Sequence, residues 1–307
     1  MATQTAKDET TDCDEIKTPG GNDELEKSIV QKMHDELGEF SYDNDQFEES
    51  LGKREKRDLV IIIEDGACYD GEWLQGTDTR QGRGKQVWPD GSIHEGYWAN
   101  NKANGQGRRI LDNGDVYDGH WKDGKVHGTG TFTDLNGGKY TGEWKEDKQH
   151  GAGLMTWPNG ASYKGNYIEG RKHGHGCFTL PNQFTYTGEY VDGNREGYGI
   201  YNFADGGEYR GMWRNNVMEG PGVFRWPDGR RYEGNFVDDK REGHGVFYWP
   251  DGRKYDGQFA NNKQHGEGAF TSRAGTTKRG LWQDGKRVKW LEPYEGSVHK
   301  NDRQVAS

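Results

Sequence analysis

A motif that recurs every 23 residues constrains this 307-residue chain more than any other feature. Each unit opens with Tyr-x-Gly-x-aromatic, as in Tyr117, Gly119 and Trp121. The opening positions are 69, 94, 117, 140, 163, 186, 209, 232, 255 and 278, all of them Tyr except His94 and Lys278, and only the first step differs, at 25 residues. A fixed period of this size is typical of repeat arrays, in which each unit packs on its neighbours.

A second half-motif, Gly-x-Gly-x-aromatic, follows in most units, as in Gly128, Gly130 and Phe132. Residues two apart share one face of a strand, so each half-motif predicts a short strand with a glycine and aromatic face. Asp-Gly between the halves and Pro-Asp-Gly between units are turn signals. The sequence therefore predicts an all-β fold, an elongated single-layer antiparallel array of about ten β-hairpins, on the order of 95 Å long at about 4.8 Å per strand.

Glycine normally weakens a strand, so its regular use needs a reason. A bare glycine leaves room for a Tyr or Trp ring from the neighbouring strand to lie across it, which is a known stabilising device. We call the side that carries these rings the aromatic face. The opposite side, which holds residues such as Thr131, Cys177 and Val223, is called the mixed face.

The acidity of the chain is confined to its beginning. The net charge is −10, but residues 1–50 hold 15 Asp/Glu and 4 Lys/Arg, so the remainder is close to neutral. A near-neutral array has no electrostatic footprint for nucleic acid. We expect residues 1–58 to be an acidic, largely disordered leader, residues 59–290 to be the array, and residues 291–307 to be a tail.

One segment of the leader has a helical pattern. Leu25, Ile29, Met33 and Leu37 recur every four residues, which predicts a helix over 22–38 with Asn22 as a cap and Gly38 at its end. Such an amphipathic stripe binds a partner or folds onto the aromatic groove of the array. A segment that stays unfolded is the third alternative.

Cysteine usage and hydropathy bear on the compartment. Cys13, Cys68 and Cys177 are odd in number and far apart, which argues against a disulfide framework and fits a reducing compartment. No apolar signal segment follows Met1, and the run Leu59–Ile63 is too short to span a bilayer. We expect a cytoplasmic protein, in a cytoskeletal or ciliary setting or at the inner face of the plasma membrane.

The sequence contains no recognisable catalytic or cofactor motif. Histidines recur before glycine, but equivalent positions in successive hairpins lie about 9–10 Å apart, too far to share a zinc ion; these histidines are His127, His150, His173 and His265. No phosphate-binding glycine loop and no nucleophile with its base is present. We predict no enzyme activity, no cofactor, no metal site and no small-molecule substrate.

The unit Tyr140–Trp144, followed by His150-Gly151-Ala152-Gly153 and Trp157-Pro158-Asn159-Gly160, resembles the MORN repeat (membrane occupation and recognition nexus). The resemblance covers about residues 69–290, and the ending 285–290 looks like the terminal cap of MORN-repeat proteins in ciliates and related protists. It implies a β-meander scaffold in cytoskeletal, ciliary or submembrane assemblies. The sequence departs from the pattern at His94, Arg109, Gln183 and Lys278.

The leading functional hypothesis is a scaffold that binds protein partners, or a second copy of itself, through the aromatic face. The residues predicted for this role are Tyr117, Trp121, Tyr140, Trp144, Tyr163, Tyr167, Tyr186, Tyr209, Trp213, Tyr232 and Tyr255. The alternative is a peripheral module that binds anionic phospholipids or phosphoinositides through Lys278, Arg279, Lys286, Arg287, Lys289 and Trp290. A third hypothesis is a regulatory partner of a lipid kinase or methyltransferase.

Overall fold

The computed structural model describes residues 28–42, 50–57, 61–63 and 66–291. Most of the predicted acidic leader and all but the first residue of the predicted tail therefore lie outside the described residues. The chain divides into two compact units, Met1–Arg171 and Lys172–Ser307.

Unit 1 contains one helix and a series of short strands. The helix is α1 (Ile29–Leu37). The strands are β1 (Arg54–Lys56), β2 (Ile61–Ile62), β3 (Cys68–Leu74), β4 (Arg80–Val87), β5 (Ile93–Ala99), β6 (Lys102–Ile110), β7 (Val116–Lys122), β8 (Lys125–Thr133), β9 (Lys139–Lys145), β10 (Lys148–Thr156) and β11 (Ser162–Ile168).

Unit 2 is built from strands alone in the residues that the structure describes. They are β12 (Arg171–Leu180), which begins at the unit boundary, β13 (Phe184–Val191), β14 (Asn194–Phe203), β15 (Glu208–Arg214), β16 (Val217–Arg225), β17 (Arg231–Val237), β18 (Lys240–Tyr248), β19 (Lys254–Ala260), β20 (Lys263–Thr271), β21 (Thr277–Gln283) and β22 (Lys286–Trp290).

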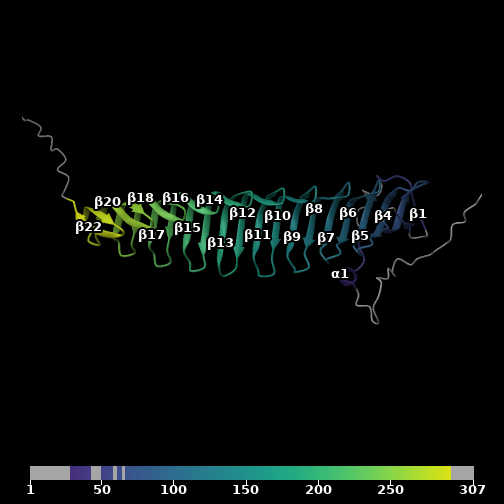
Figure 1. The fold of residues 1–307 in the computed structure, drawn as a ribbon, viewed down its shortest axis with the longest axis horizontal. Coiled ribbons are helices and arrows are strands. Elements are labelled where there is room, and N and C mark those ends of the chain that lie inside the picture. Colours follow the sequence, from purple (N-terminus) through teal and green to yellow (C-terminus); the bar gives the residue numbers. More distant parts are fainter. Residues whose placement is uncertain (1–27, 43–49, 58–60, 64–65, 292–307) are drawn as a thin grey trace, which may run out of the picture. The chain divides into compact units, whose positions relative to one another are not determined.

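Within each unit the strands from β3 onward follow one another in chain order as an antiparallel meander, which confirms the all-β hairpin fold class (Figure 1). The tight turns are the predicted ones. Asp123 and Gly124, between β7 and β8, both adopt positive φ, at 51° and 85°. Two consecutive positive φ values match the right-handed twist of the flanking strands, which is why Asp-Gly and Asn-Asn suit these turns.

The two glycines of the Gly-x-Gly half-motif differ in conformation. Gly128 has a φ of 68° and the register between β7 and β8 shifts beside it, between Gly119 and Trp121. This is a β-bulge with two extra residues on β8, because Gly119 and Trp121 are two positions apart while their partners Gly130 and Val126 are four apart. A glycine in the left-handed region accommodates the bulge. The second glycine, Gly130, pairs in register with Gly119. The expectation that both glycines serve to admit a ring is thus corrected, because the first one forms the bulge.

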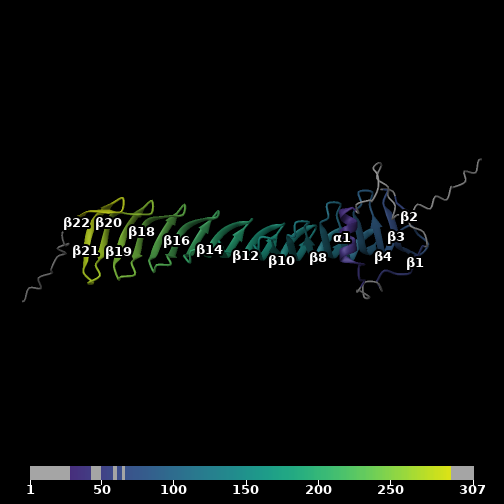
Figure 2. The ribbon, with the colours of Figure 1, turned by 90° about the horizontal axis from the view of Figure 1, so that it is seen from below.

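The helix lies on the mixed face of unit 1, across β5 to β7 (Figure 2). Its Val30 is 3% exposed and packs with Ile93, Ile110 and Val116. Of the three alternatives for this segment, folding onto the aromatic groove and staying unfolded are therefore wrong for Ile29–Leu37. Ser28 caps the start by accepting a hydrogen bond from the Gln31 amide, and Gly38 ends the helix as predicted. The predicted first turn, from Asn22, lies outside the described residues.

The start of the array departs from the sequence prediction in two ways. Part of the segment that was expected to be a largely disordered leader forms β1, which pairs antiparallel with β3 so that Arg54 lies opposite Leu74. Cys68 is disulfide-bonded, which corrects the expectation that the cysteines stay reduced, whereas Cys177 is a free thiol.

Candidate functional site

The aromatic face is organised around tyrosine rings that lie on pairs of glycines. In the repeat that starts at Tyr140, the ring covers Gly142 of its own strand and Gly153 of the neighbouring strand. A Cβ on Gly153 would lie 2.5 Å from the ring and one on Gly142 would lie 2.6 Å from the hydroxyl oxygen. The hydroxyl donates a hydrogen bond of 2.9 Å to the carbonyl of Glu143. The ring therefore packs directly on the glycine pair, and a side chain at either glycine would collide with it.

The same arrangement recurs along both units. Each opening tyrosine with this geometry donates its hydroxyl to the carbonyl three residues later, at 2.9–3.3 Å, and these are Tyr69, Tyr117, Tyr140, Tyr163, Tyr186, Tyr209, Tyr232 and Tyr255. The aromatic side chain four residues later packs edge-on against the ring, as Trp144 does on Tyr140 with centroids 5.0 Å apart. Burial raises the pKa of Tyr140 to about 12, so its hydroxyl keeps its proton.

This geometry buries the residues that the sequence analysis assigned to partner binding. Six of the tyrosines, Tyr140, Tyr163, Tyr186, Tyr209, Tyr232 and Tyr255, are 0% exposed, and Tyr117, Trp121, Tyr167 and Trp213 are at most 7% exposed. Only Trp144 in the predicted set is half-buried. Their partner binding stays a prediction, and the structure limits it, because a partner would have to displace the neighbouring rings to touch them.

His94 takes the tyrosine position in one repeat and leaves a buried nitrogen without a partner. Its ring packs edge-on between Trp98 and Trp121, with centroids 5.1 and 4.9 Å away. It is 1% exposed, and its Nε2 has no hydrogen-bond partner. Burial, followed by the charges of Arg109 and Arg80, lowers the pKa of His94 to about 3. This side chain is therefore neutral in the folded protein.

A second line of rings on the aromatic face of unit 2 is more accessible. We call it the outer row. Successive rings are in contact, with centroids 4.5 Å apart for Phe224 and Trp226, 5.4 Å for Trp226 and Phe247, and 4.6 Å for Phe247 and Trp249. The full row is Phe178, Phe184, Tyr201, Phe203, Phe224, Trp226, Phe247, Trp249, Phe270 and Trp290. Apart from the buried Phe247 and the exposed Trp290, these side chains are half-buried.

Cationic side chains lie against the outer row. The Arg195 guanidinium is 5.2 Å from the Tyr201 ring, and that of Arg241 lies 5.6 Å from Trp226 and 5.5 Å from Phe247. Each donates to the carbonyl of an asparagine in the next turn, Asn216 or Asn262, which holds it in place. Among the described residues, neither guanidinium has a carboxylate partner. The row therefore combines aromatic rings with two uncompensated positive charges.

Some members of the outer row stand out in the sequence, but the position of a residue in the repeat does not by itself separate them from the buried rings. The signal of the row was present as two aromatics two residues apart, such as Phe224 and Trp226. In unit 1 no equivalent pair is aromatic at both places: Arg109, Asp134 and Met155 each interrupt a pair, although Trp88, Phe132 and Trp157 are aromatic. Arg109 instead stacks over Trp88, with its guanidinium 4.3 Å from the ring.

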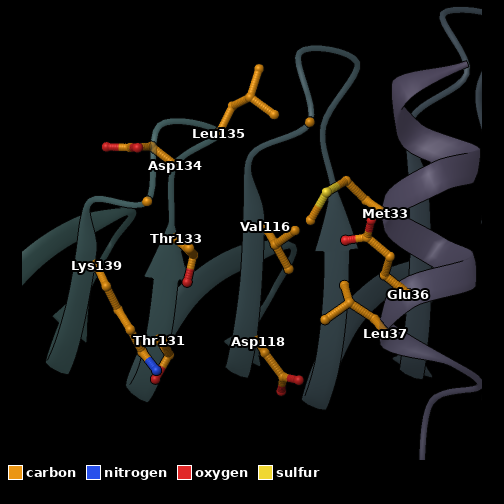
Figure 3. A pocket seen from close by; sticks show the side chains of 12 residues that line it. Met33, Glu36, Leu37, Val116, Asp118, Thr131, Thr133, Asp134, Leu135 and Lys139 are labelled. Carbon is orange, nitrogen blue, oxygen red and sulfur yellow. The ribbon is translucent and has the colours of Figure 1, made fainter. Parts of the chain in front are cut away.

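The mixed face carries a groove beside α1, of about 610 Å³ (Figure 3). Met33 and Leu37 of the helix form one wall and Val116 lies opposite, with Asp118 near one end. The helix is fixed here by polar contacts in addition to Val30. Glu95 accepts hydrogen bonds from His34 at 2.9 Å and from Arg108 at 2.7 Å. Although burial opposes ionisation, these hydrogen bonds hold the pKa of Glu95 below its ordinary value.

The predicted lipid-binding residues lie at the final hairpin. All five residues of β22 are exposed, and β22 is the last strand of unit 2 in the described chain. Arg287 stacks over Trp290 at 4.1 Å, whereas Arg279 forms an ion pair of 2.6 Å with Glu267. Neither Lys286 nor Lys289 forms an ion pair with a carboxylate in the described part of the chain. Four of the six predicted residues are thus brought together on one strand, and Arg279 is neutralised.

The described part of the chain has no cluster of three or more His, Cys, Asp or Glu side chains with metal-binding geometry. Its only helix is too short to cross a bilayer.

Comparisons with known proteins agree with the repeat pattern. A family model described as the MORN repeat matches nine stretches, at residues 69–93, 94–116, 117–139, 140–162, 163–184, 186–208, 209–230, 232–252 and 255–277. A search of curated proteins found no match.

Among solved structures, the TCP10 domain of Danio rerio CPAP in complex with a STIL peptide aligns over 78% of this chain and 100% of its own, with 14% identity and a TM-score of 0.41. The TCP10c domain of Drosophila melanogaster Sas-4 aligns over 57% and 96%, with 17% identity and a TM-score of 0.29. At such scores neither likeness carries an argument about partners.

Proposed function

Because the chain belongs to the MORN-repeat family, we propose that it is a non-catalytic scaffold that binds protein partners through the outer row of unit 2. A family of nearest-neighbour repeats offers a long repetitive surface in place of an enclosed pocket. A cytoskeletal or ciliary setting is part of the proposal and rests on the family resemblance.

The observation that supports this function is the continuous contact of rings, most of them half-buried, from Phe178 to Trp290. The opening tyrosines that lie on glycine pairs hold neighbouring strands together. Their rings are buried in this packing and are not available to a partner. The outer row has no such structural explanation, because its rings do not lie on glycine pairs. Accessible aromatic side chains beside arginines are the composition that protein interfaces favour.

We predict that replacing Trp226 and Trp249 by Ser lowers recovery of bound proteins at least tenfold in quantitative affinity purification at ~0.5 M salt. An aromatic interface is only weakly screened, so high salt should spare it in the wild type. The matched control replaces Tyr198 and Met212, exposed on the mixed face at 56% and 37%. Equal losses in the two variants, with both folded by circular dichroism, would contradict the proposal.

A second candidate function is favoured by one observation, the exposed basic strand β22. Anionic lipid headgroups attract each basic residue near a membrane surface by about 1 kcal/mol. On this alternative, changing Lys286, Arg287 and Lys289 to Ala reduces binding to phosphoinositide vesicles by roughly 150-fold, the effect of three such charges. Vesicle sedimentation measures this. The control changes Lys122, Lys145 and Lys164, which are exposed in unit 1. An equal loss of vesicle binding in this control would show that the attraction comes from positive charge in general and not from a site at β22.

A further inference from the structure

We infer that the outer row binds an acidic, proline-rich segment in the polyproline II conformation, running across the strands so that one peptide turn spans one repeat. This inference rests on the proposed function and names its partner class. It follows from the spacing of the rings, the chemistry of the row and the position of its two guanidiniums.

The spacing of equivalent rings sets the period of any ligand that runs along the row. Two ring contacts, of 4.5 and 5.4 Å, lead from Phe224 through Trp226 to Phe247, so equivalent rings are less than about 10 Å apart. Two strands per repeat at about 4.8 Å each give a step of about 9.6 Å. A ligand in register with the row must therefore repeat its contacts every 9.6 Å or so.

Among regular peptide conformations, polyproline II matches this step best. It has three residues per turn and rises about 3.1 Å per residue, so one turn advances about 9.3 Å. Two turns of an α-helix advance about 10.5 to 10.8 Å, and the mismatch accumulates to several ångströms over four repeats. A β-strand presents the same side every second residue, about 6.6 Å, which does not match. The spacing of the rings therefore favours a peptide whose contacts repeat every three residues.

The chemistry of the row agrees with that conformation. Proline rings dock between aromatic side chains, and a preformed polyproline II helix loses little entropy on binding. Its carbonyl groups make no internal hydrogen bonds and are free to accept from guanidinium donors. Arginine has five N–H donors, and the hydrogen bonds from Arg241 to Asn262 leave some of them unused.

Charge adds a preference for acidic residues. Arg195 and Arg241 lie against rings of the row, two repeats apart, and neither faces a described carboxylate. Arg287 continues the same side of the face at Trp290. An acidic residue at every third position of the ligand would thus pass each of these cations in turn, which favours Glu over Lys in the motif.

The test is a titration of the full chain with synthetic peptides at 0.1 M salt, in which tryptophan fluorescence and calorimetry measure binding. The probe contains five Pro-Pro-Glu triplets. A permuted peptide of the same composition places Glu at irregular intervals, and a third peptide has Lys in place of Glu. We expect the permuted and Lys peptides to bind at least tenfold more weakly than the probe. Replacing Trp226 and Trp249 by Ala should weaken the probe at least tenfold, while Tyr198→Ala with Met212→Ala changes it less than twofold.

Each outcome decides the inference. Equal binding of the probe and the permuted peptide overturns the three-residue period. No binding of the probe, together with loss of protein partners in the Trp226/Trp249 variant, overturns the polyproline ligand and leaves the scaffold function standing. If neither peptide nor protein binding depends on the outer row, both proposals fail.

Discussion

Gly153→Ala is expected to lower the free energy of unfolding of unit 1 by about 3 kcal/mol, at the upper end of the usual range for overpacking. The added methyl group would sit 2.5 Å from the ring of Tyr140, and that ring is enclosed by its neighbours and held by a hydrogen bond to Glu143. Chemical denaturation, followed by tryptophan fluorescence, measures the change.

A double-mutant cycle separates crowding of the ring from a general effect on the strand. In a Tyr140→Ala background the methyl group meets no ring, so Gly153→Ala should cost less than about 1 kcal/mol, and the coupling should be on the order of 2 kcal/mol. The control is Gly124→Asn, because a Cβ there meets only Lys102 at 3.9 Å and asparagine tolerates positive φ. An undiminished cost of Gly153→Ala in the Tyr140→Ala background would show that the ring is not the cause.

His94→Phe is expected to abolish part of the acid sensitivity of the wild-type protein. The pKa of His94 is about 3 in the folded state, against about 6.5 when unfolded, so below pH 6.5 the unfolded chain binds a proton that the folded protein refuses. Because of His94, the free energy of unfolding therefore falls by about 1.4 kcal/mol per pH unit as the pH falls from 6.5 towards 3. Between pH 7 and 4.5 the wild type should lose roughly 2.7 kcal/mol more than His94→Phe.

The difference between the two proteins cancels the other acidic groups, which titrate in both. His94→Tyr serves as a second variant, because its hydroxyl can donate to the carbonyl of Tyr97 as the other opening tyrosines do three residues on. It should be more stable than the wild type at pH 7 by about 1 kcal/mol, the net value of one hydrogen bond. Parallel pH profiles for wild type and His94→Phe would contradict the buried neutral state of His94.

The hairpins were predictable because their signals are local. A strand places residues two apart on one face, and Asp123-Gly124 meets the backbone demand of a tight turn wherever it occurs. The 23-residue register then places Gly119 opposite Gly130 without knowledge of anything distant in the chain. The N-terminal strand β1 was missed because Arg54–Lys56 has no alternating pattern, and its pairing with β3 supplies the reason for its conformation.

The sequence by itself determined the repeat, the fold class, the turns and the end of α1 at Gly38, since each depends on residues within a few positions of one another. Only the tertiary structure decided which rings are buried and which remain accessible. Tyr209 and Phe224 lie opposite each other on the same face, yet the Tyr209 ring leans over the bare Gly211 and Gly222 while Phe224 packs against Trp226. Parity gives the face of a side chain, but the direction in which a ring leans depends on the space its neighbours leave. The same holds for α1, whose stripe is apolar in the sequence but whose place on the mixed face is set by the complementary surface of Ile93, Ile110 and Val116.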